Sequence, residues 1–500
     1  MKRRLLLLAL LFGACILAGC QERTPVERQI TDVKTPAPTL APSPTIEPTP
    51  TPTPVPKTVA LDQRAATLVK GEEMTLSAAA SETVDAPIQW ASSDESVATV
   101  DQQGRVTGVK KGVAAITAQA GEAKATCYVS VSHRAQKSPL GDIEPPRYEL
   151  AEGVYRNKNA VDTGSATLML AGDLMCLTAQ QNAVSNGNFN KSFSYVRKVF
   201  EKSDFAIGNL ETLISSSNPY TREEIRVNNK PNCNGPATYL DAVRYANFDA
   251  VITNNNHSLD GGMQGIVETF GMLDAYGLIH TGTFLDENTQ RFLLADVNGI
   301  RVAILSYSEL YNQRSLMSGE EQALYLNPYS LDTVKRDVAA AKAAGAEFIV
   351  AYNHWGVEST HKLTSDQKSH AKEMADAGVD VIAGSHPHCL QEAAWIDAAD
   401  GRRVLCVYSM GNFVSSMGDV IHNDTIILKL DLQRQQDGVK LASAGYLGAR
   451  VHSSYQNGRH VIVPVSSDLN GGASSSTLKS AQSRINGVMG DAIEEVTTLD

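Results

Sequence analysis

From about residue 165 onward, short apolar runs alternate with longer amphipathic stretches. The apolar runs predict strands at 167–172, 205–209, 250–253, 302–306, 348–352, 379–383 and 404–408. The amphipathic stretches predict helices near 192–202, 237–246, 263–276, 331–344 and 365–377. Gly345 and Gly378 follow two of these stretches, where helices commonly end. Because strands and helices alternate, residues 165–465 are expected to form an α/β domain.

Residues 58–132 follow a different pattern, in which short alternating stretches are separated by Gly and Asp. This pattern predicts a small all-β domain. Its marked positions resemble the bacterial Ig-like domain of the second group; they are Trp90, Ser92, Asp94, Val97, Ala98, Val100, Gly104, Val106, Gly108 and Gly112. The resemblance implies a β-sandwich with Trp90 and the valines in its core and glycines at its turns. It also implies the role of a spacer, with adhesion as the alternative.

The N-terminal residues 1–19 have the features of a secretory signal. Lys2, Arg3 and Arg4 precede an apolar run, 5–17, that is too short to span a bilayer comfortably. The run ends in Leu-Ala-Gly-Cys20, which resembles the lipobox of bacterial lipoproteins. The resemblance implies lipidation of Cys20 and anchoring to the outer side of the membrane. An ordinary cleaved signal and a short membrane anchor are the alternatives.

Three further segments carry no recognisable chemistry. Residues 20–57 are rich in Pro and Thr, which predicts an extended polyproline II linker. At about 3.1 Å per residue, its Pro-rich part forms a stalk of roughly 70 Å. Residues 133–164 are interpreted as a connector, and 466–500 as a polar tail.

Composition narrows the possible functions. A chain of 500 residues is too long for one ordinary core, so two or three domains are expected. The net charge of −11 argues against nucleic-acid binding, but an anionic substrate is compatible with a bound metal. Five cysteines remain after position 20 and have no CxxC spacing. They indicate neither a disulfide framework nor a cysteine zinc site, although one disulfide is possible.

Potential ligands follow nearly every predicted strand of the α/β domain. They are Asp173, Asn209, Glu211, Asn256, His257, His354, His386, His388 and Asn412. Taken alone, Asp173 could equally cap a helix, and His354 could be a packed core histidine. Ligands bind at the carboxyl ends of the strands in an open α/β sheet, so these side chains are expected to converge. Imidazole with carboxylate suits Zn²⁺, Mn²⁺ or Fe²⁺, and a bridging carboxylate can hold two such cations.

The ordered motifs around these residues resemble the CapA family, which is associated with poly-γ-glutamate capsule synthesis and belongs to the metallophosphoesterase superfamily. The motifs are Gly172-Asp173, Asn209-Leu210-Glu211, Asn256-His257-Ser258-Leu259-Asp260, His354-Trp355-Gly356, Gly384-Ser385-His386-Pro387-His388 and Gly411-Asn412. The resemblance implies a metallophosphoesterase-like β-sandwich flanked by helices. It also implies one or two divalent cations, an anionic polymer such as poly-γ-glutamate as partner, and possible membrane synthase subunits.

The resemblance assigns a role to each residue. Asp173 and His388 bind the first metal, and Glu211 bridges both. Asn256, His354 and His386 bind the second metal. His257 acts as general acid or stabilises an oxyanion. Asn209 and Asn412 line the pocket.

One position departs from the superfamily pattern. Superfamily phosphatases have a histidine two residues after the first aspartate, where this chain has Met175. A thioether is a poor ligand for a hard cation, so the first metal is weakly held, completed by water, or absent. Two functions therefore remain open: a metal-dependent hydrolase of a phosphoester or amide-type bond in envelope-polymer metabolism, and a non-catalytic subunit that binds the polymer or supports a synthase.

Overall fold

The computed structural model describes residues 57–499 apart from 136–144, 160, 185–186 and 288. The predicted signal, Cys20 and almost all of the predicted linker lie outside the described residues. Within the described part, every helix is too short or too polar to cross a membrane.

The N-terminal part of the described chain is an all-β sandwich. One sheet has the order β2 (Ala65–Val69), β9 (Ala123–Ser132), β8 (Gly112–Ala120), β5 (Gln89–Ser92), and the other has β3 (Glu73–Thr75), β7 (Arg105–Gly108), β6 (Ala98–Val100). β1 (Val59–Leu61) pairs with β4 (Ala78–Ala80). Trp90 packs in the core with Val106 and Ile116. The prediction of an Ig-like domain is confirmed.

The large domain contains two extended sheets. The eight-stranded sheet has the order β10 (Tyr148–Ala151), β11 (Val154–Asn157), β18 (Leu293–Val297), β19 (Ile300–Ser308), β20 (Phe348–His354), β21 (Val381–Ser385), β23 (Arg403–Met410), β22 (Leu390–Asp397). The nine-stranded sheet has the main order β17 (Ile279–Thr281), β16 (Ala250–Ile252), β13 (Phe205–Leu210), β12 (Ser165–Leu174), β25 (Asp424–Gln435), β26 (Gly438–Tyr455), β27 (Gly458–Pro464), while β24 (Asn412–Val414) pairs with β12 and β28 (Glu494–Glu495) with β26. A small hairpin, β14 (Arg226–Val227) and β15 (Lys230–Pro231), stands apart from both sheets.

Alternating side chains on each strand separate an inner core from an outer one. On β12, Leu168 and Leu170 join the core shared with the eight-stranded sheet, and Met169 and Ala171 face the helices outside. Those helices are α2 (Asn190–Phe193), α3 (Arg197–Phe200), α4 (Thr238–Tyr245) and α5 (Gly262–Ala275), with α1 (Thr178–Ala183) nearby in the chain. Because β12 is buried on both faces, its sequence is a nearly continuous apolar run.

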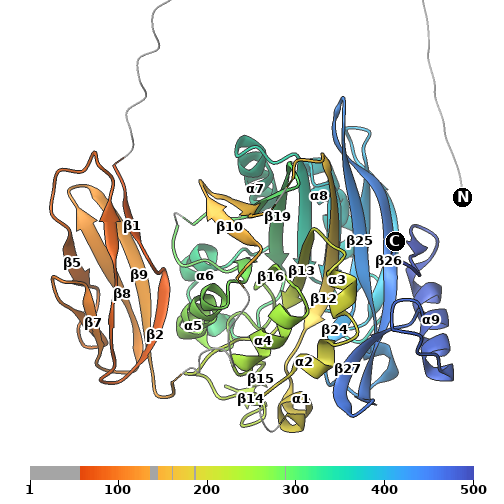
Figure 1. Ribbon diagram of the computed structural model, residues 1–500, viewed down its shortest axis with the longest axis horizontal. Helices are drawn as coiled ribbons and strands as arrows, with labels where there is room; N and C mark the ends of the chain where they lie inside the picture. The colour runs from red at the N-terminus through yellow and green to blue at the C-terminus, as the bar shows by residue number, and fades with distance from the viewer. Residues whose placement is uncertain (1–56, 136–144, 160, 185–186, 288, 500) are drawn as a thin grey trace, which may run out of the picture. The chain divides into compact units, whose positions relative to one another are not determined.

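A second group of helices covers the outer face of the eight-stranded sheet (Figure 1). α7 (Leu331–Ala343) and α8 (Ser365–Ala377) pack Val338 and Met374 against Ile349 of β20. α6 (Gly319–Tyr325) and two short 3₁₀ turns, 314–316 and 420–422, lie in the connections. The result is the expected metallophosphoesterase-like sandwich flanked by helices.

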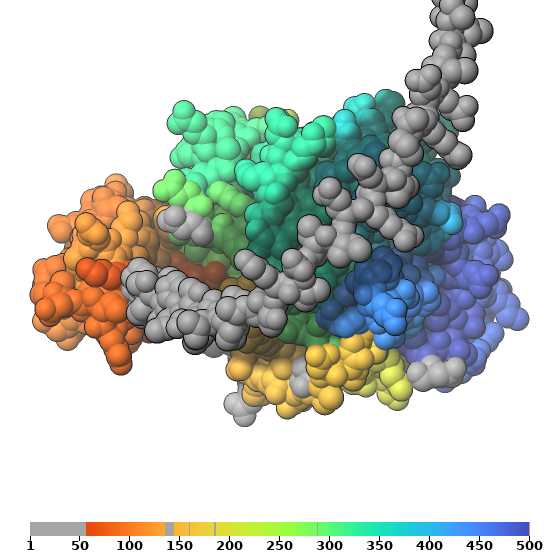
Figure 2. Space-filling view, turned by 90° about the horizontal axis from the view of Figure 1, so that it is seen from above, coloured from red at the N-terminus to blue at the C-terminus, as the bar shows by residue number. Residues whose placement is uncertain are grey.

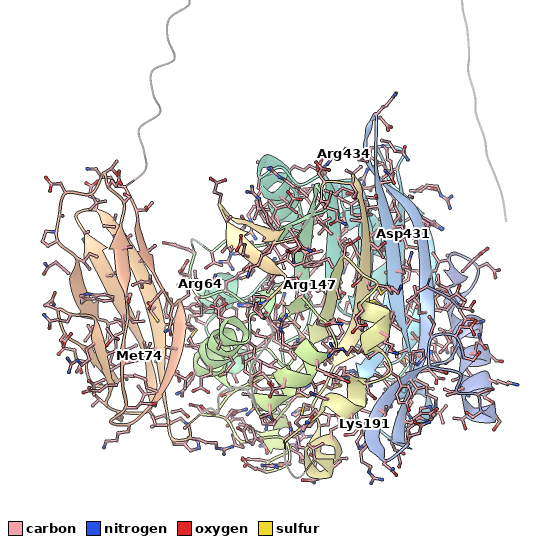
Figure 3. The ribbon with its side chains drawn as sticks, in the orientation of Figure 1. Arg64, Met74, Arg147, Lys191, Asp431 and Arg434 are labelled. Carbon is pink, nitrogen blue, oxygen red and sulfur yellow. The ribbon has the colours of Figure 1, made fainter. Side chains whose placement is uncertain are left out.

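Part of the predicted connector, residues 133–164, belongs to the eight-stranded sheet. β10 and β11 form a hairpin that extends the eight-stranded sheet, with β11 parallel to β18. Arg147, labelled in Figure 3, donates through Nε to Asp249 Oδ1 at 2.8 Å. The segment 145–157 is therefore part of the large domain.

The predicted polar tail also differs from the structure. α9 (Ser476–Met489) buries Leu478, Ala481, Ile485 and Met489 in the inner core, and β28 pairs with β26. These positions lie on one face of a helix. The sequence did not predict this helix because the Gly/Ser-rich run before it favoured a polar tail. In the space-filling view of Figure 2, the C-terminal residues (blue) form part of the domain surface.

Two smaller expectations are also resolved. The single helix expected near 192–202 is two short helices, α2 and α3, separated by residues 194–196. The five cysteines among the described residues are all buried free thiols.

Candidate metal centre

Strands from both sheets end at one cluster of polar side chains. Asp173 is the last but one residue of β12, Glu211 follows β13, and His354 ends β20. A Cβ at Gly172 would lie 2.0 Å from the Gly411 carbonyl oxygen, so glycine lets the chain before β24 pass directly beside β12. The structure brings all nine residues singled out in the sequence to this cluster or its immediate support, and all nine are buried.

One half of the cluster consists of Asp173, Glu211 and His388. Their potential ligand atoms all lie within 4.8 Å of one another. His388 Nδ1 is 3.3 Å from Asp173 Oδ2, and His388 Nε2 is 3.6 Å from Glu211 Oε1. These three side chains could hold one cation.

The other half consists of Glu211, His354 and His386, again with ligand atoms within 4.8 Å of one another. His354 Nε2 lies 3.1 Å from Asn256 Oδ1, 3.1 Å from His386 Nδ1 and 3.7 Å from Glu211 Oε1. Four donor atoms thus surround a second position, and Glu211 belongs to both halves.

Three carboxylate oxygens of the cluster lack hydrogen bonds within the described residues, although the fourth, Asp173 Oδ1, has one. Within the described part of the chain, Asp173 Oδ2 and both oxygens of Glu211 have no hydrogen-bond partner. Both side chains are 0% exposed. An unpartnered buried polar atom costs about 1–3 kcal/mol, and a charged one costs more. Carboxylates without partners beside three imidazoles fit divalent cations in both chemistry and number.

The electrostatics favour neutral imidazole on one side of Glu211 and a cation on the other. Burial, with help from neighbouring histidines, lowers the pKa of His354 well below its ordinary value and that of His386 to about 3. Burial opposes protonation of His388 too, but Glu211 and Asp173 raise its pKa to about 10. Burial raises the pKa of Glu211 well above its ordinary value; His388 opposes this rise, and Asp173 adds to it.

Two asparagines and a serine orient the ligands. Asn209 Nδ2 donates to Asp173 Oδ1 at 2.9 Å. His354 Nδ1 lies 3.0 Å from Ser385 Oγ, which leaves its Nε2 directed at Glu211. His388 Nδ1 lies 3.0 Å from the Oδ1 atom of Asn412. Partners of this kind fix the ring orientation of metal-binding histidines, so Asn209 and Asn412 act as supports of the cluster.

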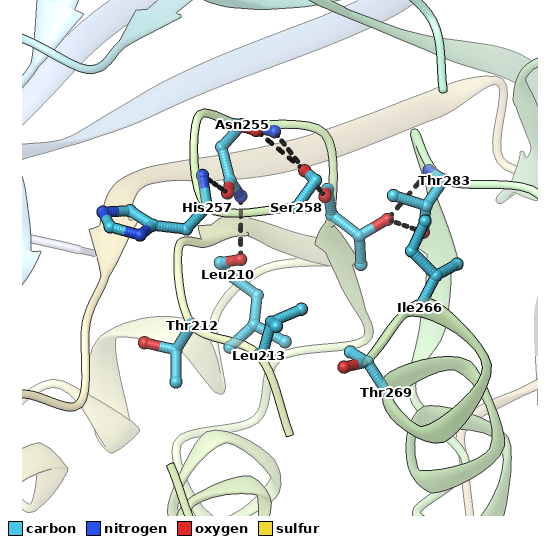
Figure 4. A pocket seen from close by; sticks show the side chains of 10 residues that line it. Leu210, Thr212, Leu213, Asn255, His257, Ser258, Ile266, Thr269 and Thr283 are labelled. Carbon is cyan, nitrogen blue, oxygen red and sulfur yellow. Dashed lines mark hydrogen bonds between the residues drawn. The ribbon is translucent and has the colours of Figure 1, made fainter. Parts of the chain in front are cut away.

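His257 is held beside the cluster by an acidic partner. Its Nδ1 lies 2.6 Å from Asp260 Oδ2, which also accepts a bond from Cys233 N at 2.8 Å. Asn255 bonds the backbone of His257 and the carbonyl of Leu210, as Figure 4 shows. The bond to Asp260 keeps the proton on Nδ1 and leaves Nε2 as the free nitrogen.

The turn that carries two of the histidines has an unusual backbone. His386 and His388 have φ of +94° and +57°, values that residues other than glycine adopt uncommonly. Each such residue costs about 1–3 kcal/mol, so the surrounding structure must impose the conformation. Both rings reach the cluster only because the turn holds this conformation.

Two acidic residues were missed as site residues in the sequence. Asp260 is part of the motif 256–260, but no role at the site was predicted for it from the sequence. Its position three residues after His257 was the signal for a histidine–aspartate pair. Glu358 lies in the loop after β20 and forms a third group with His386 and His388, with ligand atoms within 4.8 Å. An acid four residues after His354, in a loop at the ligand-bearing edge, was the available signal.

Comparisons with known proteins agree with these observations. The family model described as bacterial capsule synthesis protein PGA_cap matches residues 167–417. The model of the bacterial Ig-like domain (group 2) matches residues 56–129.

Two curated relatives match the large domain at low identity. The capsule biosynthesis protein CapA of Bacillus anthracis is 27% identical over 274 residues, which are 53% of this chain and 64% of the relative. The PGA biosynthesis protein CapA of Bacillus subtilis (strain 168) is 25% identical over 269 residues, 53% of this chain and 68% of the relative. The chain thus spans less than two thirds of the length of the Bacillus anthracis relative.

Proposed function

Because the chain belongs to the bacterial capsule synthesis protein family PGA_cap, we propose that it is an extracytoplasmic metal-dependent hydrolase acting on poly-γ-glutamate or a related envelope polymer. The observation that carries the proposal is the set of three buried carboxylate oxygens, on Asp173 and Glu211, that lack hydrogen-bond partners within the described part of the chain. They lie beside three imidazoles that could complete a cation site.

Each half of the cluster would hold one divalent cation. Asp173 and His388 would bind the first, Asn256, His354 and His386 the second, and Glu211 both. When bound, such a pair supplies Lewis acidity and activates water for attack on a phosphoester or amide-type bond.

The chain's own proton donor would be His257. With Nδ1 bonded to Asp260, its Nε2 is the nitrogen that can donate to the departing group. Asp260 also stabilises the imidazolium that forms if this nitrogen is protonated first. The acidic partner thus makes His257 suited to general-acid work.

The remaining parts of the chain fit work at a cell surface. Lipidation at Cys20 would anchor the protein to the outer side of the membrane. The Pro/Thr-rich linker and the Ig-like domain would then act as a spacer that carries the large domain towards the polymer.

Metal content tests the centre. The full chain, purified in detergent, is analysed by mass spectrometry after equilibration with Mn²⁺ or Zn²⁺ and removal of loose metal. We expect bound metal in the wild type and its loss in the His386→Ala/His388→Ala double variant. His452→Ala, which removes a partly buried histidine on β26, serves as the control and should keep its metal. A wild-type chain without bound divalent metal would end the proposal.

Turnover tests the hydrolase. A panel of phosphoesters and γ-glutamyl peptides is incubated with the metal-loaded chain and with the His257→Ala variant. Turnover that the variant loses while keeping its metal supports the proposed role of His257. Equal turnover by both proteins would remove His257 from the mechanism.

A second function is favoured by one observation, Met175 at the position of the usual histidine. In this alternative, the cluster holds metal for structure, and the domain binds the anionic polymer or supports a membrane synthase. Metal-dependent binding of poly-γ-glutamate, without turnover of any member of the panel, would favour this alternative over the hydrolase.

A further inference from the structure

The loop after β20 is fixed against the turn that carries two of the histidines. Ser359 N donates to Pro387 O at 2.9 Å. One residue further on, Gln391 Nε2 donates to Thr360 O at 3.1 Å. These bonds hold the backbone on the C-terminal side of Glu358 against the turn that carries His386 and His388.

Glu358 occupies the solvent side of the cluster. A carboxylate oxygen of Glu358 and one ring nitrogen from each of His386 and His388 all lie within 4.8 Å of one another. Glu358 is exposed and both histidines are buried. Because Glu211 is 0% exposed, the cluster has one carboxylate in the interior and another at its mouth.

The first metal position has a deficit that Glu358 can correct. Among the described residues, its buried ligand group consists of Asp173, Glu211 and His388. Met175 brings a thioether where superfamily phosphatases have an imidazole. A hard divalent cation binds carboxylate oxygen far better than thioether sulfur. Glu358, whose carboxylate lies within 4.8 Å of ring nitrogens of both His388 and His386, is an acidic side chain at the mouth that supplies the required kind of donor.

We propose that Glu358 is a ligand of the first cation and replaces the imidazole that Met175 cannot provide. The inference rests on the proposed metal centre and names one further residue of it. The first position then has three carboxylates and one imidazole, a harder donor set than that of the second position. Such a set shifts the relative affinity towards Mn²⁺ and away from Zn²⁺.

Metal titration of the full chain tests this ligand. Binding of Mn²⁺ is followed by calorimetry and by the loss of the free-ion resonance signal in the wild type and in Glu358→Gln. We expect one of two Mn²⁺ equivalents to weaken by at least about tenfold, the scale of a disturbed metal site, while the other is unchanged. Glu320→Gln, at an exposed glutamate on α6, is the matched control and should bind like the wild type.

A second variant tests whether Glu358 takes the place of a histidine at position 175. Met175→His in the Glu358→Gln background should restore two-cation binding and raise the affinity for Zn²⁺ relative to Mn²⁺. Because Glu358 is exposed, melting of metal-free Glu358→Gln should match that of the wild type.

The outcomes separate this inference from the proposed function. Two Mn²⁺ equivalents with unchanged affinity in Glu358→Gln would overturn the inference and leave the centre intact. Failure of the wild type to bind any divalent cation would overturn the proposed function as well.

Discussion

Replacement of Glu211 by Gln should change stability in opposite directions with and without metal. Glu211 is fully buried, its two oxygens lack hydrogen-bond partners within the described residues, and it belongs to both halves of the cluster. The metal-free variant should therefore be more stable than the metal-free wild type. With Mn²⁺ present the order should reverse, because only the wild type keeps the ligand shared by both cations.

The size of the metal-free effect follows from the pKa of Glu211. Burial raises this pKa well above its ordinary value of 4.5. A carboxyl with a raised pKa takes up a proton on folding, so it lowers the stability of the folded chain as pH rises above 4.5. At about 1.4 kcal/mol per pH unit, the interval to pH 7 corresponds to at most roughly 3 kcal/mol. Glutamine does not titrate, so the variant avoids this loss of stability. His388 still has an acidic partner in the variant, because Asp173 Oδ2 lies 3.3 Å from its Nδ1.

Scanning calorimetry of the full chain at pH 7, with chelator or with Mn²⁺, measures both effects. At about 2 °C per kcal/mol for a large domain, the metal-free variant should melt up to roughly 6 °C above the wild type. The gain should shrink at pH 5, where the carboxyl in the unfolded chain also retains part of its protons. A variant that melts below the wild type in both chelator and Mn²⁺ would refute the reasoning.

Three further predictions concern other parts of the large domain. Asp260→Asn removes a charged hydrogen bond to His257, worth about 1.5–3 kcal/mol, so turnover should fall roughly 10- to 150-fold with metal content unchanged by mass spectrometry. Leu478→Ala should lower the free energy of unfolding by about 2–5 kcal/mol in denaturant titration, whereas a free C-terminal tail would show no effect. Gly172→Ala places a Cβ 2.0 Å from the Gly411 carbonyl oxygen, so calorimetry should show a loss of about 1–3 kcal/mol, and wild-type stability would contradict the tight packing of these chain segments.

The sequence predicts the central strands of the large domain well because they are buried on both faces. β13 and β20 consist of buried residues throughout, so they read as plain apolar runs. The long strands β25 and β26 were missed because neither is buried throughout: β25 is buried at its start and exposed at its end, and β26 is buried only in its middle. Their identity depends on pairing with β12 and with each other, which lies outside any local window.

The candidate site was predictable where a ligand follows a strand. Asp173, Glu211 and His354 all lie at strand ends, where a parallel sheet gathers its functional side chains. The positive φ of His386 and His388 was not predictable, because it is imposed by the surrounding fold.

Glu358 and Asn412 show the other limit of sequence reasoning. Glu358 reaches the site through a loop whose path is fixed by bonds to distant residues, such as that between Ser359 and Pro387. Asn412 is expected to line the pocket, but its contact with His388 Nδ1, at 3.0 Å from its Oδ1 atom, was not foreseen. Such pairings across the fold leave no periodic signal in the sequence.

The central claim is that Asp173, Glu211 and the three clustered histidines bind divalent cations. Anomalous diffraction at the manganese edge, from crystals of the chain grown with Mn²⁺, tests it most directly. The account predicts anomalous peaks within bonding distance of Glu211, one beside His388 and one beside His354. Strong peaks only elsewhere in the molecule, with Glu211 bonded to none, would contradict it.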